Sequence, residues 1–319
     1  MTDQFGRTID YMRLSVTDRC NLRCRYCMPE GVKFLDHREI LRYEEVLQIA
    51  QAAVGLGIVN FKVTGGEPLV RRDCADFIRR LKELPGVRTV SLTTNGVLLS
   101  PLARELAEAG VDWVNISLDA PDRETFAAIT GFDVLDRVLA GMDACEEAGL
   151  PFKLNCVLLP DSRDRLVPLA RFAQERPVDV RFIEMMPIGL GAGSTGITWE
   201  EALTVLRREW PDLRPVEERR GNGPARCYAS GALRGRIGVI DAVSHKFCAQ
   251  CNRVRLTSTG QLKPCLCYSE GTDLREILRT CPERLTETMR EVIFHKPRAH
   301  CFDRAGDITE QKCMSQIGG

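Results

Sequence analysis

Three cysteines near the start of the chain have the spacing of a cluster-binding motif. Cys20, Cys24 and Cys27 form a CxxxCxxC run, and Tyr26 directly precedes the last cysteine. A [4Fe–4S] cluster has four irons that each need a terminal ligand, so three thiolates leave one iron open to a small molecule. Zinc is the alternative, but it needs a fourth ligand, and the nearest further His or Cys is His37. The triplet therefore predicts an iron–sulfur cluster with one open iron.

A second cysteine group lies in the last third of the chain. It consists of Cys248, Cys251, Cys265 and Cys267. A zinc ribbon closed by all four is one interpretation, since the spacing suits Zn²⁺. Arg253 and Arg255 favour another, because residues two apart on an extended chain point the same way. Guanidinium groups bind phosphate or carboxylate bidentately, so this pair indicates an anionic ligand beside the metal.

Composition narrows the class of protein. The chain has 319 residues, 44 basic and 44 acidic, so no overall field favours nucleic acid or a membrane surface. The start lacks the regions of a signal peptide and the apolar stretches are short, so we expect a soluble, cytoplasmic protein. Fourteen cysteines in a reducing compartment favour thiolate ligands over disulfides. Cys74, Cys145 and Cys156 lie in apolar-periodic segments and are expected to be core residues.

The first half of the chain has the pattern of repeated βα units. Short Val-, Ile- and Leu-rich runs alternate with segments of helical period. The expected strands are Met12–Val16, Asn60–Thr64, Thr89–Thr94, Trp113–Leu118, Phe152–Leu158 and Val180–Met185. The expected helices are Tyr43–Val54, Asp73–Leu84, Ser100–Ala109, Val134–Ala148 and Leu166–Glu175. Gly57, Gly110 and Gly149 follow three of these helices as stops.

Parallel βα units form either a doubly wound sheet or a barrel, and pattern alone does not choose between them. In a barrel, functional groups gather at the carboxyl ends of the strands. The chemical motifs of the first half all lie at such ends, which favours a partial (β/α)6 TIM-type barrel in the α/β class.

The chain changes character after the sixth unit. Residues 187–196 and 217–223 are rich in glycine and read as connectors. Beyond them we expect a strand at Gly235–Asp241, a hairpin around Leu256–Leu262, and helices at Leu274–Arg279 and Leu285–Phe294. We interpret this part as an accessory α+β unit rather than a seventh repeat. The predicted division is a barrel over residues 1–230 and a C-terminal region over 231–319.

Taken together, the motifs resemble those of the GTP 3′,8-cyclases, radical S-adenosylmethionine (SAM) enzymes that carry out the first step of molybdenum cofactor biosynthesis. The resemblance runs from about Arg13 to Gly319. The first triplet is common to many radical SAM enzymes. The motifs that carry the resemblance are Thr17–Pro29, Thr64–Pro68, Thr93–Gly96, Cys248–Arg255 with Cys265, and the terminal Ile317-Gly318-Gly319.

The resemblance implies two [4Fe–4S] clusters and a bound SAM. Cys20, Cys24 and Cys27 would hold the cluster that reduces SAM, and Cys248, Cys251 and Cys265 would hold a second cluster that binds the guanine base. The implied SAM-binding residues are Tyr26, Gly66, Ser117 and Met186. In the run Gly65-Gly66-Glu67-Pro68, glycines would let the backbone approach SAM and the acid could meet its ammonium; a tight turn would account for the glycines alone.

The substrate brings several negative charges, and basic residues inside apolar strands are costly unless an anion pairs with them. The resemblance implies that GTP is bound by Arg13, Lys62, Thr93, Lys153, Arg253, Val254 and Arg255. Arg71 and Arg72 could add to the phosphate field or begin a solvated helix. The radical made from SAM would take the C3′ hydrogen of the ribose, and ring closure on C8 of guanine would give (8S)-3′,8-cyclo-7,8-dihydro-GTP.

Two features of the C-terminal part need separate interpretation. Gly318 and Gly319 resemble the family's catalytic tail, although a disordered terminus is the ordinary fate of terminal glycines. Cys267 stands where the family more often has an aromatic residue. If Cys267 also bound the second metal, no iron would be open for guanine, so its ligation is left open here.

The resemblance also implies partners: a low-potential electron donor such as a flavodoxin or ferredoxin, a cyclic pyranopterin monophosphate synthase that acts on the product, and a homodimeric assembly. Two other functions compete with cyclisation. A radical SAM peptide-modifying enzyme with an auxiliary cluster should lack the CNRxR run and the terminal diglycine. A non-catalytic iron–sulfur or zinc protein would need neither the barrel nor the GGEP turn.

Overall fold

One mixed sheet runs through the molecule. The computed structural model describes residues 1–28, 31–218 and 221–318. The strands are β1 (Tyr11–Ser15), β2 (Asn60–Thr64), β3 (Thr89–Thr94), β4 (Trp113–Ser117), β5 (Phe152–Leu158), β6 (Asp179–Glu184), β7 (Arg214–Val216), β8 (Arg226–Ala229), β9 (Ile237–Ile240), β10 (Arg253–Leu256), β11 (Gln261–Lys263) and β12 (Thr272–Asp273). Their order in the sheet is β12-β11-β10-β1-β2-β3-β4-β5-β6-β9-β8-β7.

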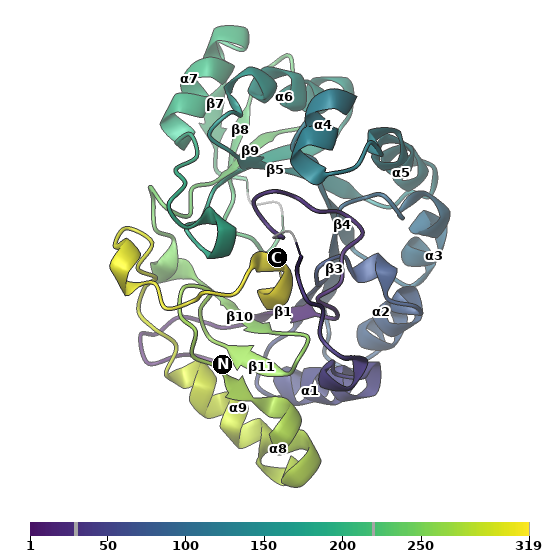
Figure 1. The fold of residues 1–319 in the computed structure, drawn as a ribbon, viewed down its shortest axis with the longest axis vertical. Helices are drawn as coiled ribbons and strands as arrows, with labels where there is room; N and C mark the ends of the chain where they lie inside the picture. The colour runs from purple at the N-terminus through teal and green to yellow at the C-terminus, as the bar shows by residue number, and fades with distance from the viewer. Residues whose placement is uncertain (29–30, 219–220, 319) are drawn as a thin grey trace.

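Helices cover the outer face of the sheet. They are α1 (Tyr43–Gly55), α2 (Cys74–Lys82), α3 (Ala103–Glu108), α4 (Arg123–Thr130), α5 (Leu135–Glu147), α6 (Leu166–Glu175), α7 (Trp199–Glu209), α8 (Leu274–Thr280), α9 (Leu285–Phe294) and α10 (Met314–Ile317). Figure 1 shows α1 to α7 around the outside of the strands, with α8 and α9 together at one end. None of the helices in the described ranges combines the length and apolar character needed to cross a membrane.

The first six strands are parallel neighbours and form the expected partial barrel. Each strand lies within one residue of its predicted bounds. Their apolar side chains pack with the helices in one large core. The fold class predicted from the βα pattern is therefore confirmed.

The helical-period argument missed the four-residue helix α10 and two longer helices, α4 and α7, which both have capping signals in the sequence. Asp122 accepts a hydrogen bond from the backbone of Thr125 at the start of α4, and Gly131 ends that helix with φ 80°. Thr198 and Glu201 form a capping box at the start of α7. Helix α4 has only eight residues, so its apolar stripe is brief, whereas α7 has eleven and lies beyond the sixth βα unit, in a stretch to which the sequence argument assigned no element.

The C-terminal strands extend the barrel at both edges, where the sequence interpretation placed a separate accessory unit. Strand β9 runs parallel beside β6, and β10 runs parallel beside β1. Residues from this part, such as Ile237, Val254 and Met289, belong to the same core as the first six strands. Strand β9 therefore continues the parallel series that was expected to stop at six. The predicted division at residue 230 stays a prediction.

A smaller apolar cluster holds the end of the chain. It contains Ile188, Leu266, Cys267, Cys301, Phe302 and Ile317. Figure 1 shows the C-terminus near the centre of the view, in front of the strands, so the last residues return over the barrel. The tail therefore lies beside the loop that carries Cys265 of the second cysteine triplet.

Candidate active site

The two predicted cysteine triplets line one cavity. Its volume is about 300 Å³, and Cys20, Cys24, Cys27, Cys248, Cys251 and Cys265 all lie on its wall. Eight other predicted site residues share that wall: Arg13, Tyr26, Gly66, Thr93, Ser117, Met186, Arg253 and Arg255. Lys62, Lys153, Val254 and Gly318 are described but do not line the cavity, and Gly319 lies outside the described residues.

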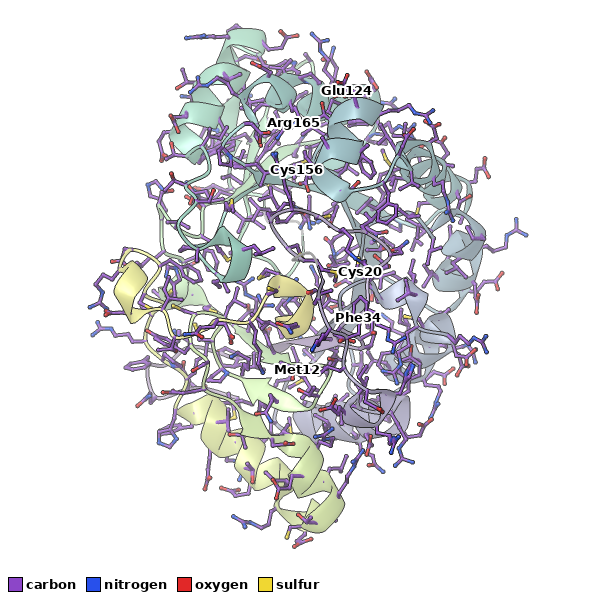
Figure 2. All side chains as sticks on the ribbon, viewed as in Figure 1. Met12, Cys20, Phe34, Glu124, Cys156 and Arg165 are labelled. Atoms are coloured by element: carbon purple, nitrogen blue, oxygen red, sulfur yellow. The ribbon has the colours of Figure 1, made fainter. Side chains whose placement is uncertain are left out.

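The first triplet lies in the loop after β1, and Figure 2 shows its first member, Cys20, near the centre of the view. The backbone of Arg23 and Arg25 donates to Thr130 and Ile129 at the end of α4, at 2.8 and 3.0 Å, which fixes this loop to the barrel. Asn95 donates to the Cys20 Sγ at 3.7 Å. Burial raises the pKa of all three thiols, that of Cys27 to about 12. Thiolates at these positions therefore need a positively charged metal centre to offset the burial.

The GGEP turn supports this loop rather than offering its acid to a ligand. The Gly66 N–H donates to the Thr17 carbonyl at 2.7 Å, and a Cβ on Gly66 would lie 2.4 Å from the Arg19 carbonyl oxygen. Glu67 is 1% exposed and does not line the cavity. Its carboxylate accepts from the Thr94 hydroxyl at 2.8 Å and from the Asn95 N–H at 2.7 Å. The expected meeting of this acid with the SAM ammonium is therefore wrong.

The other predicted SAM residues gather at the ends of β4 and β6. Ser117 ends β4, and Met186 follows β6. Tyr26 reaches the same region, where its hydroxyl donates to the Asp119 carboxylate at 2.6 Å. Asp119 also lines the cavity and accepts from the Val157 N–H at 2.7 Å. The motif search missed Asp119, although it lies two residues after Ser117 in the same strand-end segment.

Basic residues from three adjacent strands lie side by side at the cavity. Arg13 on β1 stands in register between Lys62 on β2 and Arg255 on β10. Burial, followed by the charges of neighbouring cations, lowers the pKa of Lys62 and Arg255 well below their usual values. Burial also lowers the pKa of Arg13 to about 10. Such a cluster is stabilised by an anion placed among the charges.

Lys153 and Val254 do not line the cavity, and their surroundings differ from those of the residues that do. Lys153 lies near the start of β5, with its Nζ 3.9 Å from an Asp179 carboxylate oxygen. Val254 is 1% exposed and stands opposite Met12 in the core. A contact between Val254 and substrate would therefore use its backbone.

Arg181 is a further cation that the sequence argument missed. It lies on β6, is buried, and donates to the Asn115 side chain. Its positive charge is among those that lower the pKa of Lys62. The signal was present in the sequence, because Arg181 is a charged residue inside an apolar strand, as Arg13 and Lys62 are.

Arg71 has a structural setting away from the cavity. Its guanidinium donates to the carbonyls of Val16 at 2.6 Å and Leu41 at 2.9 Å. It also lies 3.9 Å from the centre of the Tyr43 ring. Arg71 and Arg72 line a separate hollow of the surface, so neither adds to the cations of the site cavity.

The second triplet is carried by the loop before β10 and the loop after β11. Cys248 accepts from the His300 N–H at 3.4 Å. Burial raises the pKa of the Cys251 thiol, but the charges of Lys296 and Arg253 outweigh it and bring the value to about 7. Lys296 also donates to the carbonyl of Pro264, the residue before Cys265. Lys296 and His300 line the cavity, and no local motif pointed to them.

Cys267 is turned away from the second triplet. It is fully buried and does not line the cavity. Its Sγ lies 2.7 Å from the Sγ of Cys301, and the Cys301 N–H donates to it at 3.2 Å. Cys267 therefore belongs to the apolar cluster that holds the tail, whereas Cys265 faces the site.

The tail reaches the basic cluster. The Gly318 carbonyl accepts from Arg255 Nη1 at 2.6 Å. Gly318 has φ +88°, and a Cβ there would lie 2.7 Å from the Ser15 Cβ. Only glycine fits this close approach of the tail to β1.

The two triplets suit cuboidal clusters. Among the residues of the described ranges, no three His, Cys, Asp or Glu side chains are grouped to hold a single metal ion. The ligands of a four-iron cluster bind different iron atoms, so its cysteines need not meet at one point. Each triplet presents three thiols to one cavity wall, which fits a cluster with an open iron facing that cavity.

Comparison with known proteins agrees with this geometry. Residues 14–173 match the family model described as Radical SAM superfamily, and residues 178–302 match Molybdenum Cofactor Synthesis C. A GTP 3′,8-cyclase of Geobacter sulfurreducens is 45% identical, covering 100% of this chain and 99% of the relative. One of Clostridium perfringens (strain 13) is 39% identical, covering 100% of each. The chain belongs to the GTP 3′,8-cyclase family. The resemblance drawn from the motifs is thereby confirmed.

Solved structures of other radical SAM proteins share the fold of this GTP 3′,8-cyclase family member. Streptococcus suis SuiB bound to S-adenosylmethionine is 14% identical, with a TM-score of 0.63 over 96% of this chain and 76% of that chain. Native anSMEcpe with bound AdoMet is 17% identical, with a TM-score of 0.61 over 97% of this chain and 93% of that one. At these identities the likeness concerns the fold alone.

Proposed function

We propose that this protein is a GTP 3′,8-cyclase, which converts GTP to (8S)-3′,8-cyclo-7,8-dihydro-GTP in molybdenum cofactor biosynthesis. The observation that carries the proposal is the meeting of two cysteine triplets and three arginines on one cavity wall, in a chain that belongs to this family over its whole length. When bound, SAM and its reducing cluster supply the radical that removes the ribose C3′ hydrogen.

The chain's own residues hold the reactants at opposite sides of the cavity. Cys20, Cys24 and Cys27 bind the reducing cluster. Tyr26, Gly66, Ser117 and Met186 surround SAM, and their positions at strand ends suit a barrel-mouth site. Cys248, Cys251 and Cys265 would hold the second cluster, which would supply an open coordination position for the guanine base.

Cations bind the triphosphate and fix its direction. Arg13, Arg253 and Arg255 lie on the cavity wall, with Thr93 as a polar neighbour. Lys62 lies beside Arg13 in the middle of β2, Lys153 lies near the start of β5, and Val254 contributes its backbone. A fixed ribose is essential, because the first step removes whichever hydrogen lies nearest. The proposed contribution of the protein is therefore orientation.

The tail and the partners complete the proposal. Gly318, held by Arg255, and Gly319 act as the catalytic tail. The electron donor is a low-potential flavodoxin or ferredoxin, and the product passes to a cyclic pyranopterin monophosphate synthase. The enzyme acts in the cytoplasm, as a homodimer.

Anaerobic incubation with SAM, dithionite and GTP tests the proposal. Mass spectrometry should detect 5′-deoxyadenosine together with a cyclised isomer of GTP, and iron analysis of the reconstituted protein should give about eight irons per chain. Deoxyadenosine without the isomer would remove GTP as the substrate. Zinc in place of iron, with no cleavage of SAM, would overturn radical chemistry as a whole.

A further inference from the structure

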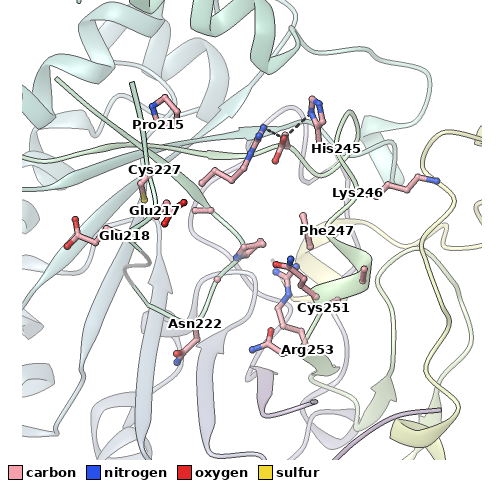
Figure 3. Close-up of a pocket in the computed structure, with 18 of the residues that line it drawn as sticks. Pro215, Glu217, Glu218, Asn222, Cys227, His245, Lys246, Phe247, Cys251 and Arg253 are labelled. Carbon is pink, nitrogen blue, oxygen red and sulfur yellow. Dashed lines mark hydrogen bonds and ion pairs between the residues drawn. The ribbon is translucent and has the colours of Figure 1, made fainter. Parts of the chain in front are cut away.

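A second, larger cavity adjoins the active site. Its volume is about 920 Å³, and its wall comes from β7, β8 and the loop before β10 (Figure 3). Among the described residues, three line both this outer cavity and the site cavity, namely Phe247, Cys251 and Arg253. These three side chains therefore form the wall between the two spaces.

Phe247 and Arg253 contact each other within this wall. The Arg253 guanidinium carbon lies 4.9 Å from the centre of the Phe247 ring, a cation–π arrangement. The other arginine among the described residues that line the outer cavity, Arg226, is paired with the Asp241 carboxylate. Within the described ranges, no ion pair with a carboxylate is found for Arg253. Its side-chain neighbours in the wall are thus the uncharged Phe247 ring and the Cys251 sulfur, which hydrogen-bonds it.

The type of support affects what Arg253 can do. A carboxylate partner would cancel much of the guanidinium charge and compete with an anionic ligand. An aromatic face attracts the cation without carrying a net charge, so the positive charge stays available to phosphate. The ring also limits the directions in which this long side chain can turn toward the outer cavity.

We propose that Phe247 is a positioning residue for the nucleotide. Its ring holds the Arg253 guanidinium in the wall, directed at the phosphates of GTP, and separates the site from the outer cavity. This inference rests on the proposed binding of GTP. It assigns a specific role to the aromatic ring of Phe247, distinct from its apolar volume, and that distinction can be tested.

The test compares variants that keep volume with variants that keep the ring. Phe247→Leu and Phe247→Met keep apolar bulk but lose the ring face; Phe247→Tyr keeps both. Equilibrium dialysis of the reconstituted protein with GTP should show affinity weakened roughly five- to tenfold in the first two and within about twofold of wild type in the third. In an Arg253→Gln background, Phe247→Leu should weaken GTP binding no further.

Controls separate this role from a structural one. Phe247 directly precedes Cys248, a proposed cluster ligand, so a substitution could disturb cluster binding. Iron per chain is therefore measured for every variant. If Phe247→Leu loses iron, the comparison uses Phe247→Met instead. Tyr43→Leu removes another ring–arginine contact, with Arg71 at 3.9 Å, among residues that do not line the site cavity, and should leave GTP affinity unchanged. The positioning role of Phe247 would be overturned if wild type, Phe247→Leu and Phe247→Met bound GTP with equal affinity. It would also be overturned if Phe247→Leu weakened GTP binding as much in the Arg253→Gln background as in wild type. Failure of the wild-type protein to bind GTP would instead overturn the proposed function.

Discussion

At the residue scale, neighbouring thiols in one short segment have different surroundings. Cys265 faces the site cavity, whereas Cys267 is buried against Cys301. A metal-bound thiolate must reach the metal, and Cys267 cannot do so while it packs in the apolar cluster that holds the tail. The open iron that guanine requires is therefore compatible with a chain that has four cysteines in this region.

Serine substitutions should separate the two thiols. Cys267→Ser should keep about eight irons per chain and cyclase activity, because its thiol is not a ligand. Cys265→Ser should lose one cluster, leaving about four irons, and with it the formation of product. Iron analysis after anaerobic reconstitution, with product measured by mass spectrometry, decides between them. Loss of iron from the Cys267 variant would return this thiol to the ligand set.

Gly66 is a second residue whose surroundings permit a sharp prediction. An added Cβ would meet the Arg19 carbonyl oxygen at 2.4 Å, so Gly66→Ala must displace the loop that carries the first triplet. A displacement near 1 Å can cost roughly a hundredfold in rate, and SAM cleavage should fall by that order. Gly55→Ala is the matched control, because nothing lies within 4 Å of its Cβ. SAM cleavage by the Gly66 variant at the wild-type rate would contradict this account.

At the scale of elements, a buried carboxylate ties β2 to β3. Glu67 follows β2, and its oxygens accept hydrogen bonds from Thr94 and Asn95 at the end of β3. The Glu67 carboxylate also accepts a hydrogen bond from the N–H of Leu69, which lies in the short helix η2 (Pro68–Val70). The strand ends that carry Gly66 and Thr93 are thereby held in a fixed relation.

The same carboxylate should give stability a pH dependence. Burial raises the pKa of Glu67 from 4.5 to about 7, which favours the protonated form in the folded state. Its contribution is therefore greatest below pH 4.5 and is lost as the pH rises to about 7, by about 3 kcal/mol in all. Glu67→Gln should flatten this slope and cost about 1–3 kcal/mol, because one amide hydrogen would face the Asn95 N–H. Anaerobic urea unfolding at several pH values measures both effects; parallel curves for the two proteins would contradict the assignment.

At the scale of the whole molecule, the C-terminal part completes the sheet rather than standing apart from it. Strands β9 and β10 pair with β6 and β1, so each edge of the six-stranded barrel is covered by chain from beyond residue 230. This pairing also brings Arg255 beside Arg13 in register. The buried basic cluster is thus assembled only when both parts of the chain are folded together.

A fragment of residues 1–230 should therefore fail to fold on its own. It would expose both parallel edges and lose buried residues such as Ile237, Val254 and Met289 from the shared core. Circular dichroism and urea unfolding should show no cooperative transition for the fragment, in contrast to the full chain. A cooperative transition would instead support an independent domain ending at residue 230.

The sequence by itself determined the barrel and most of the site. The βα alternation predicted all six parallel strands of the barrel, and cysteine spacing with the nearby arginines identified the two cysteine groups that line the site cavity. These features are local, because periodicity and ligand spacing are properties of adjacent residues. The missed helices α4 and α7 also had local signals, in their capping residues.

Only the tertiary structure decided which groups share an environment. Cys267 meets Cys301, Lys296 comes beside Cys251, and Glu67 turns toward β3 instead of the cavity. Each of these contacts joins positions on different segments, and no spacing rule specifies them. The physical reason is that burial and charge are set by what packs against a side chain, which depends on the pairing of strands across the whole sheet.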